Sequence, residues 1–450
     1  MTDSPKNVQT SAPLHRLLQQ AADAVQGVRD GRSLTELLAR VPAELRPGTQ
    51  ALSFAVLRRL GSAQALRAQL APKAPPPRVD GLLLCALALL WPEADGAAPM
   101  YAEHTLVDQA VKAAKQRAPA SAGFINAVLR RFLRERAALV AAAQHDPLGA
   151  YNHPAWWVEK LRQDWPAQWQ AILVANNLAP PMTLRVNARH MDADAYVARL
   201  AEQGMAAQAL GGVTPQGVLL DKPQPVQALP GFAQGWASVQ DAAAQLAAPL
   251  LLGAHAGLPA LPAGARVLDA CSAPGGKTAH LLELQDLDLT ALDADAQRLA
   301  RVQDTLARVG QAATLKAADA RQTAAWWDGR PFDAILLDAP CSASGIVRRH
   351  PDVRWLRRAE DIGALARIQA ELLDALWPLL RPGGRLVYAT CSVFRAEGQA
   401  QLDAFLQRQP DARSHDVPGF TGHLLPLADN GGQPRPSTLD GFFYALIHKT

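Results

Sequence analysis

From about residue 264 the sequence alternates between short apolar segments and longer amphipathic ones, and no other feature limits the possible folds as strongly. Five apolar segments have the length of strands: ARVLDAC, LDLTALDAD, ATLKAADAR, FDAILLDAP and GRLVYATCS. Segments with the spacing of amphipathic helices separate most of them. Strands that alternate with helices predict a doubly wound, Rossmann-like parallel sheet. The final segment, GFFYALIHK, predicts an antiparallel strand at an edge of this sheet.

The chain before this region has two parts with different patterns. Residues 14–143 have helical spacing throughout, interrupted by APKAPPPR, whose consecutive prolines cannot continue a helix. They predict an all-helical bundle. After it, PMTLRVNAR alternates like a strand and DADAYVARLAEQG has helical spacing, which together predict a small α+β module. A chain of 450 residues has the length of about three domains. We predict them at residues 1–145, 146–240 and 241–450.

Composition and the N-terminal segment argue against a secreted or membrane protein. MTDSPKNVQTSAP lacks the basic-then-apolar pattern of a signal peptide. The longest apolar run, Leu82 to Trp91, is too short to span a bilayer and predicts a buried helix. Four cysteines in 450 residues suggest neither a disulfide framework nor paired C-x-x-C metal sites. We therefore expect a cytoplasmic location, free thiols and no bound metal. The net charge of +4 does not by itself indicate a nucleic acid partner.

Acids and thiols gather where the predicted strands end. Ligands of doubly wound sheets bind beyond the carboxyl ends of the strands, so these positions predict a site. The residues at the five strand ends are Asp269 and Cys271, Asp293 and Asp295, Asp319, Asp338 and Cys341, and Thr390 and Cys391. Three of the four cysteines are among them.

The glycine turn after the first strand indicates which cofactor these acids could serve. SAPGGKT resembles a phosphate-binding P-loop, but that motif needs a glycine where this sequence has Cys271. The G-x-G-x-x-G motif of NAD-binding proteins is absent from this turn. An acid about twenty residues further on could bind the ribose of an adenosine cofactor. Asp293 fits, with Asp295 as the alternative unless Asp295 only caps the next helix. S-adenosylmethionine fits best, because its sulfonium charge suits a rim of carboxylates.

Two cysteines on neighbouring strands, followed by a basic segment, suggest covalent chemistry on a polyanion. Cys341 and Cys391 lie beside Asp338 and Thr390, which favours a reactive thiolate over a buried structural thiol. The segment RRHPDVRWLRR would bring nucleic acid to this rim through its phosphates, unless it is only a solvated basic loop. The predicted RNA-binding residues are Arg348, Arg349, Arg357 and Arg358. Cys85, within an apolar helix, is expected to be structural.

Three motifs at these positions carry a family resemblance. DACSAPGGKT, LLDAPCSASGIVRRHPDVRWLRR and LVYATCSV resemble the RNA (cytosine-5) methyltransferases of the Fmu/Sun type. EHTLVDQAVKAAK and GFINAVLRRFLRE look like the NusB-like helical domain at the N-terminus of one branch of that family, which acts on 16S (small-subunit) ribosomal RNA. WASVQDAAAQLAAPLL and DGFFYALIHK are similar to the lead-in and the final strand of its catalytic domain. The resemblance covers nearly the whole chain.

The resemblance implies a role for each site residue. Cys391, in TCS, would be the nucleophile, Cys341, in PCS, would permit product release, and Asp338 would lie at the boundary between cofactor and base. Ser272 and Ala318 depart from the commoner alanine and glycine without removing a functional group. The resemblance also implies a monomer that needs no metal or membrane. For S-adenosylmethionine, the resemblance implies the loop Cys271, Ser272, Ala273, Pro274, Gly275, Gly276 and Lys277 for the methionine portion, Asp293 for the ribose, Asp319 for the adenine, and Asp338 at the boundary with the base.

The implied reaction explains why a thiol is needed. Carbon 5 of cytosine is a poor nucleophile, and addition of a thiolate to carbon 6 makes it an enamine carbon that can accept a methyl group. Three other functions remain possible at this stage. A DNA cytosine methyltransferase is disfavoured by the second cysteine and the helical front domain. A methyltransferase of another RNA, such as tRNA, stays open. A non-catalytic RNA-binding factor with this fold is disfavoured by the intact acids and cysteines.

Overall fold

The computed structural model describes residues 12–92, 99–255, 257–427 and 438–450. The N-terminal residues 1–11, which carry most of the segment read for a signal peptide, lie outside this range. The chain forms two compact units. The helical unit comprises Met1–Gln163, Asn176–Ala179 and Val347–Arg357, and the sheet unit comprises Asp164–Ala175, Pro180–Ile346 and Arg358–Thr450. The boundaries at 145 and 240 stay a prediction.

The helical unit confirms the predicted all-helical region. Its helices are α1 (Leu14–Arg29), α2 (Leu34–Ala39), α3 (Arg46–Arg58), α4 (Leu60–Leu70), α5 (Pro77–Leu90), α6 (Glu103–Arg117), α7 (Ala122–His145), α8 (Pro147–Tyr151), α9 (Ala155–Asp164) and the short α15 (Val353–Leu356). Helix α5 begins with Pro77, where the missing N–H is harmless. Every residue from Val79 to Leu90 on it is buried, including Cys85, as expected of a helix that is apolar all round. Within the described residues, no helix is both long and apolar enough to cross a membrane.

The strands and the helix α11 of the predicted small α+β module lie in the sheet unit and follow α10 (Trp169–Asn177), whereas residues 146–163 and 176–179 of its predicted range belong to the helical unit. Its strands are β1 (Met182–Val186), β2 (Ala207–Gly211), β3 (Thr214–Leu220) and β4 (Ala237–Val239), in the order β2-β3-β1-β4 and all antiparallel. Helix α11 (Ala193–Glu202) is capped by Asp192, whose side chain accepts from Ala195 N. It buries Tyr196 and Leu200 against Leu184 and Val218 of the sheet.

The predicted parallel sheet is confirmed. Its strands β5 (Arg266–Asp269), β6 (Asp288–Asp293), β7 (Thr314–Ala317), β8 (Phe332–Asp338) and β9 (Leu380–Thr390) run parallel in the order β9-β8-β5-β6-β7. The chain therefore builds outward from β5 to β7, then returns to place β8 on the other side of β5. Strand order reverses at β5, which is where such sheets bind ligands.

The last strand, β12 (Phe442–Lys449), pairs antiparallel with β9, as predicted, but the predicted edge position is wrong. On its other side β12 pairs with β10 (Ala412–His415) and β11 (Gly422–Leu424). These two strands have only four and three residues. Alternation over so few residues is too short to distinguish a strand from a loop.

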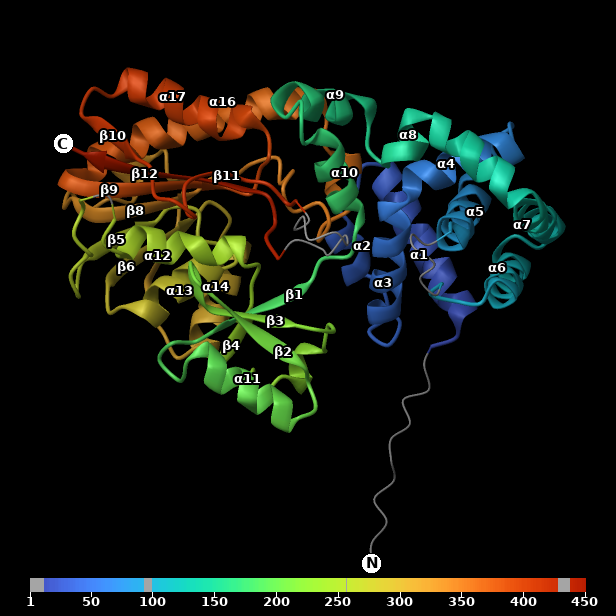
Figure 1. Cartoon of the computed structure of the whole chain (residues 1–450), viewed down its shortest axis with the longest axis horizontal. Coiled ribbons are helices and arrows are strands. Elements are labelled where there is room, and N and C mark those ends of the chain that lie inside the picture. The colour runs from blue at the N-terminus through green and yellow to red at the C-terminus, as the bar shows by residue number, and fades with distance from the viewer. Residues whose placement is uncertain (1–11, 93–98, 256, 428–437) are drawn as a thin grey trace, which may run out of the picture. The chain divides into compact units, whose positions relative to one another are not determined.

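Helices cover both faces of the large sheet, as Figure 1 shows. One layer contains α12 (Ala247–Leu252), α13 (Gly276–Leu284) and α14 (Ala296–Arg308), and the other contains α16 (Ala359–Leu376) and α17 (Gln399–Arg408). Successive residues of a strand point to opposite faces. Accordingly Leu336 of β8 joins the first layer's core, while Ile335 and Leu337 join the second. Burial on both faces explains the unbroken apolar run of β8.

Candidate active site

The loop from β5 to α13 brings its backbone close to α14. Gly275, the residue before α13, has φ 97°, and a Cβ there would lie 3.0 Å from Val302 Cα. Only glycine suits this left-handed, crowded position. Asp269, at the end of β5, is fully buried and accepts a hydrogen bond from Thr278 Oγ1 at 2.7 Å. Burial raises the pKa of Asp269 to about 7.

Asp293 and Asp295, both considered for the ribose, have different surroundings. The Asp295 side chain accepts from Gln297 N and Arg298 N at the start of α14, so the capping role considered for it is confirmed. Asp293 is 4% exposed and accepts from Ala273 N at 3.2 Å, within the glycine loop. Asp293 is therefore the acid that β6 places against the loop.

Asp319, the residue assigned to adenine, is engaged by a neighbour. The Arg321 guanidinium donates to both of its oxygens, with Nη2 2.7 Å from Oδ2. These hydrogen bonds from Arg321 lower the pKa of Asp319. The carboxylate is ionised and anchored after β7, and its adenine contact stays a prediction.

Asp338 and Lys277 form an ion pair between the β8 end and the first turn of α13. Lys277 Nζ lies 2.7 Å from Asp338 Oδ2. Burial alone would lower the pKa of Lys277, but the adjacent charge and hydrogen bond of Asp338 outweigh it and raise that pKa. The side chain of Asp338 is 28% exposed, so it keeps access to a ligand. The pair joins the glycine loop to the strand that leads to Cys341.

The structure brings Cys341 and Cys391 together. Their sulfur atoms are 3.3 Å apart, just beyond the ends of β8 and β9. Backbone hydrogen bonds keep the two sulfur atoms close together. Ala339 N donates to Ala389 O at 2.9 Å, and Gly345 N donates to Cys391 O at 3.0 Å. The hydrogen bond with Cys391 and burial raise the pKa of Cys341 well above its usual value. The two thiols are thus within hydrogen-bonding distance, and either sulfur can be the donor.

Cys271, the third cysteine at the strand ends, is in buried surroundings. Burial and then the charge of Asp269 raise its pKa well above the usual range. A thiol held neutral in this way is a packing group at the start of the glycine loop. Its predicted contact with the cofactor stays a prediction.

The basic segment after PCS differs from the predicted exposed loop. Residues 347–357 belong to the helical unit, and Arg348 and Arg354 are fully buried there. Arg354 donates to Asn152 O and Asn176 O, and Arg58 donates to Arg348 O at 2.6 Å. The guanidinium of Arg348 is thus withdrawn from solvent, which argues against the direct RNA contact predicted for it. Arg349 and Arg357 are half-buried and Arg358 is exposed, so their roles stay predictions.

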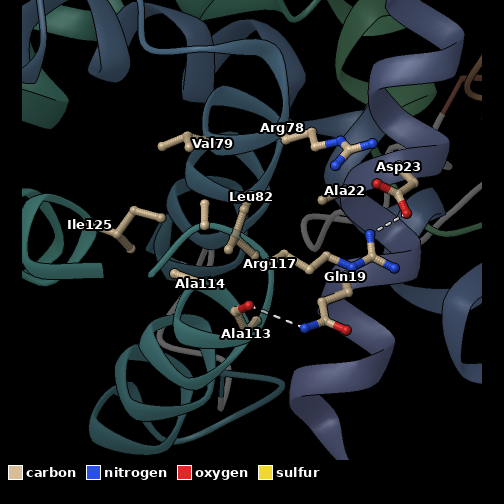
Figure 2. Close-up of a pocket in the computed structure, with 11 residues that line it drawn as sticks. Gln19, Ala22, Asp23, Arg78, Val79, Leu82, Ala113, Ala114, Arg117 and Ile125 are labelled. Carbon is tan, nitrogen blue, oxygen red and sulfur yellow. Dashed lines mark hydrogen bonds and ion pairs between the residues drawn. The ribbon is translucent and has the colours of Figure 1, made fainter. Parts of the chain in front are cut away.

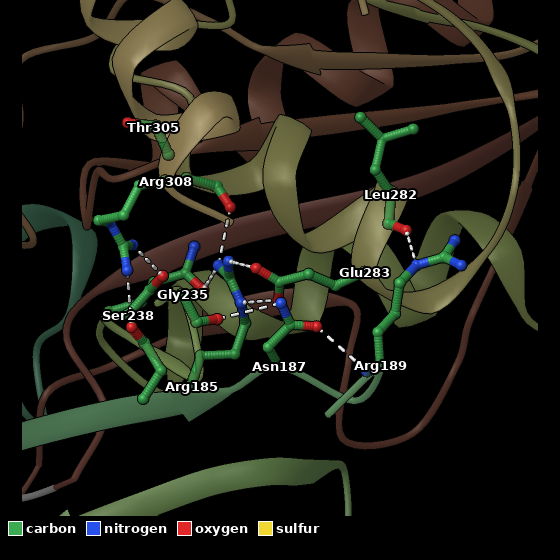
Figure 3. Close-up of polar contacts among 12 residues, drawn as sticks. Arg185, Asn187, Arg189, Gly235, Ser238, Leu282, Glu283, Thr305 and Arg308 are labelled. Carbon is green, nitrogen blue, oxygen red and sulfur yellow. Dashed lines mark hydrogen bonds and ion pairs between the residues drawn. The ribbon is translucent and has the colours of Figure 1, made fainter. Parts of the chain in front are cut away.

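Behind the glycine loop, a buried arginine of the small module supports α13. Arg185 of β1 is fully buried and makes a bidentate ion pair with Glu283, at 2.7 and 2.8 Å, as Figure 3 shows. Its Nη1 also donates to Gly276 O at 2.7 Å, at the first residue of α13. Arg185 therefore fixes the helix that begins at the glycine loop.

The helical unit has a pocket of its own, between α1, α5 and α6 (Figure 2). Gln19 Nε2 donates to Ala113 O across it at 3.1 Å, and Arg117 pairs with Asp23. Its volume is about 20 Å³, room for about one water molecule. This pocket is too small for a nucleoside cofactor.

Sequence reasoning missed the residues that support these groups. Glu397, Ser342 and Ser392 bind one another behind the two thiols, and Arg185 supports the glycine loop. One signal was visible, since a serine follows each cysteine in PCS and TCS. Neither Glu397 nor Arg185 has a local signature, because their partners are distant in sequence.

Comparison with known proteins gives the same three-part arrangement. The family described as 16S rRNA methyltransferase RsmB/F matches residues 260–448, the RsmF/B-like ferredoxin-like domain matches residues 153–227, and the NusB family matches residues 17–134. These matches confirm the NusB-like and α+β predictions.

Relatives cover almost the whole chain. A protein named ribosomal RNA small subunit methyltransferase B, from Pseudomonas syringae pv. tomato, is 44% identical, with 95% of this chain and 96% of that protein covered. Its namesake from Pseudomonas putida is 45% identical, covering 95% and 97%. A solved methyltransferase homologue from Pyrococcus horikoshii is 26% identical with a TM-score of 0.55, over 67% of this chain and 97% of that one. The chain belongs to the RsmB/F family of 16S rRNA methyltransferases.

Proposed function

We propose that this protein methylates carbon 5 of a cytosine in 16S ribosomal RNA through a covalent bond between Cys391 and the base. The observation that carries the proposal is the pair of thiols 3.3 Å apart at the ends of adjacent strands. A methyltransferase acting on oxygen or on an exocyclic nitrogen needs no thiol. Two thiols suit a reaction with separate addition and elimination steps.

The cofactor is S-adenosylmethionine, which supplies an electrophilic methyl group when bound. The residues at the strand ends fit it chemically. Asp293 would accept hydrogen bonds from the ribose hydroxyls, and the backbone of the loop from Cys271 to Lys277 would follow the methionine portion. Asp319 would face the adenine. The negative charges of Asp293 and Asp338 suit a positively charged sulfonium.

The two thiols divide the work on the base. The pattern of the family assigns the addition to carbon 6 of cytosine to Cys391, and Cys341, whose sulfur lies 3.3 Å away, acts in a later step. Asp338, oriented by Lys277, would hydrogen-bond the edge of the base and stabilise the adduct. After carbon 5 has gained its methyl group, Cys341 would act as a proton relay, taking up the carbon-5 proton while its own proton passes to the departing Cys391 sulfur. The electron pair of that C–H bond then expels the Cys391 sulfur from carbon 6.

The substrate class follows from the relatives' names and from the NusB-like region. The relatives are named for small-subunit ribosomal RNA. The target cytosine has to be unstacked to reach the strand ends. Such a substrate would place the enzyme in the cytoplasm, and we infer that it acts as a monomer.

A labelling experiment tests the substrate and the position of the methyl group. The full chain is incubated with methyl-labelled S-adenosylmethionine and unmodified 16S ribosomal RNA, transfer RNA or duplex DNA. We expect label only in ribosomal RNA, recovered as 5-methylcytosine after digestion. Label in transfer RNA would show that the substrate is a different RNA. Label in DNA would support the DNA methyltransferase alternative, and the absence of label in all three nucleic acids would favour a non-catalytic factor.

Cysteine variants test the division of labour. Cys391→Ala removes addition to carbon 6, so methylation and covalent RNA adducts should both be lost. Cys341→Ala permits addition and methyl transfer but stalls elimination, so a protein–RNA species should accumulate only with S-adenosylmethionine present. Denaturing electrophoresis detects it. Adducts in the Cys391 variant alone would exchange the two roles.

A further inference from the structure

Behind the two thiols lies a carboxylate to which the proposed reaction gives no role. Glu397 follows β9 in a short 3-10 turn (Arg395–Glu397), and its side chain is fully buried. We propose that Glu397 is a positioning residue that binds the loops after Cys341 and Cys391 and thereby sets the approach of their sulfur atoms. This inference rests on the proposed two-thiol reaction and adds a residue to it.

Glu397 binds the serine that follows each cysteine. Ser342, after Cys341, donates twice, from N to Oε1 at 2.8 Å and from Oγ to Oε2 at 2.5 Å. Ser392, after Cys391, donates from Oγ to Oε2 at 2.6 Å. One carboxylate oxygen therefore joins both loops, each at the residue next to its thiol.

The contact between the loops extends beyond the carboxylate. Ser344 Oγ lies 2.8 Å from Ser392 Oγ and accepts from Val393 N at 3.0 Å. Between Ser342 and Ser344, Ala343 has φ 59°, a left-handed conformation that is unfavourable for a non-glycine residue. The loop adopts this conformation because hydrogen bonds on both sides of Ala343 hold it.

Glu397 is itself fixed from two other elements. Gln369 of α16 donates through Nε2 to Glu397 Oε1 at 3.2 Å and to Pro340 O at 2.9 Å. The Glu397 carbonyl accepts from Tyr388 OH at 2.8 Å and Thr390 Oγ1 at 3.2 Å, both on β9. Glu397 is therefore held in place by α16 and β9 as well as by the two loops, so a shift of one loop alone would break hydrogen bonds to the carboxylate.

A carboxylate suits this place better than an amide. The four donors around Oε1 and Oε2 come from Ser342, Ser392 and Gln369, and hydrogen bonds to a charged acceptor are shorter and stronger than neutral ones. The negative charge also contributes to raising the pKa of Cys341, after the larger effects of the Cys391 hydrogen bond and burial. Glu397 would thus help Cys341 keep its proton while holding it near Cys391.

The test measures the approach of the two thiols without RNA. The full-length protein is equilibrated with oxidised and reduced glutathione, which converts the thiols of Cys341 and Cys391 to a disulfide while one oxidised glutathione becomes two reduced molecules. Peptide mass spectrometry gives the exchange constant. Glu397→Gln should lower it by at least about tenfold, the effect of losing one charge-assisted hydrogen bond, and Glu397→Ala should lower it further.

Serine variants show whether Glu397 acts through the loops. Ser342→Ala and Ser392→Ala should each lower the exchange constant in the wild-type background, and neither should lower it further in the Glu397→Ala background. Glu283→Gln is the matched control, since Glu283 is also a buried carboxylate of the sheet unit but binds Arg185. It should leave thiol exchange unchanged. Glu397→Gln and the serine variants keep the test usable if Glu397→Ala does not fold.

Activity supplies a second measurement. Misplacing a reacting group by about 1 Å can lower a rate by about 10²-fold. The kcat of Glu397→Gln should therefore fall by up to about 10²-fold, while the KM for S-adenosylmethionine and for RNA stays within about twofold of wild type. Thiol exchange equal to wild type in both Glu397 variants would overturn the proposal. Failure of the wild-type protein to form 5-methylcytosine would overturn the proposed function instead, because thiol exchange needs neither RNA nor cofactor.

Discussion

Asp269 is a carboxyl group that folding removes from water at the end of β5. Burial, together with the charges of Asp338 and Asp293, raises its pKa to about 7, against the hydrogen bond from Thr278. Between about pH 4 and pH 7 the folded protein therefore holds a proton at Asp269 that the unfolded chain has released. In this window only the unfolded chain releases the proton of Asp269 as the pH rises. The contribution of Asp269 to the free energy of unfolding therefore falls with rising pH.

Asp269→Asn should remove this dependence, because an amide cannot ionise and its oxygen still accepts from Thr278. The free energy of unfolding of the variant relative to wild type should rise by up to about 1.4 kcal/mol per pH unit between pH 4 and 7, then level off. Urea unfolding at a series of pH values measures it. A difference that does not change with pH would contradict the raised pKa.

At the scale of elements, β1 of the small module supports the helix that begins the cofactor loop. Replacing Arg185 with methionine leaves Glu283 buried and unpaired, which should cost about 3–5 kcal/mol in the free energy of unfolding. It also removes the hydrogen bond to Gly276 O. Affinity for S-adenosylmethionine should therefore fall, and titration calorimetry measures it.

A neighbouring pair provides the control. Arg189 pairs with Asp286, whose side chain is 83% exposed, and such a surface pair contributes only about 0–1 kcal/mol. Arg189→Met should therefore have a much smaller effect on stability. The double variant Arg185→Met with Glu283→Met should recover much of the lost stability, since no buried charge remains. If Arg185→Met and Arg189→Met lowered the free energy of unfolding equally, Arg185 would not have the supporting role given to it here.

At the scale of the whole molecule, the predicted attraction for RNA depends on charges near residue 350. Replacing Arg349, Arg357 and Arg358 with glutamine should weaken RNA binding and reduce the slope of log affinity against log salt by about 0.9 per lost phosphate contact on a duplex. Affinity for S-adenosylmethionine should stay unchanged. Arg330→Gln, with a side chain 71% exposed, is the control and should leave the slope as in wild type. An unchanged slope in the triple variant would make the segment a solvated basic surface.

The sequence allowed the prediction of those features that have a short-range pattern. Strands β5 to β9 are apolar runs between amphipathic helices, and the strand ends then locate Asp293, Cys341 and Cys391. The strands β10 and β11 were missed because they are too short to show alternation. The predicted exposure of Arg348 failed because its burial depends on contacts within the helical unit, such as that of its carbonyl with Arg58, 290 residues away.

The supporting residues of the site could not be predicted for a related reason. Ser342 and Glu397 are 55 residues apart, and Arg185 and Glu283 are 98 apart. Each side chain alone is compatible with a solvated surface, which is the usual place of a charged residue. Their burial depends on a partner that only the completed fold supplies. The reacting groups were therefore predictable, whereas the residues that hold them were not.

The position of β12 has a consequence for how the protein is made. Strand β9 ends at the residue before Cys391, and one of its two sides is covered by β12, residues 442–449, which are synthesised after every other strand of the sheet. At about 5–20 residues per second, the ribosome exposes β9 several seconds before its partner exists. During that interval β9 is an unpaired edge, open to association with other chains. A nascent chain thus contains both thiols before the strand that covers this side of β9 has been made.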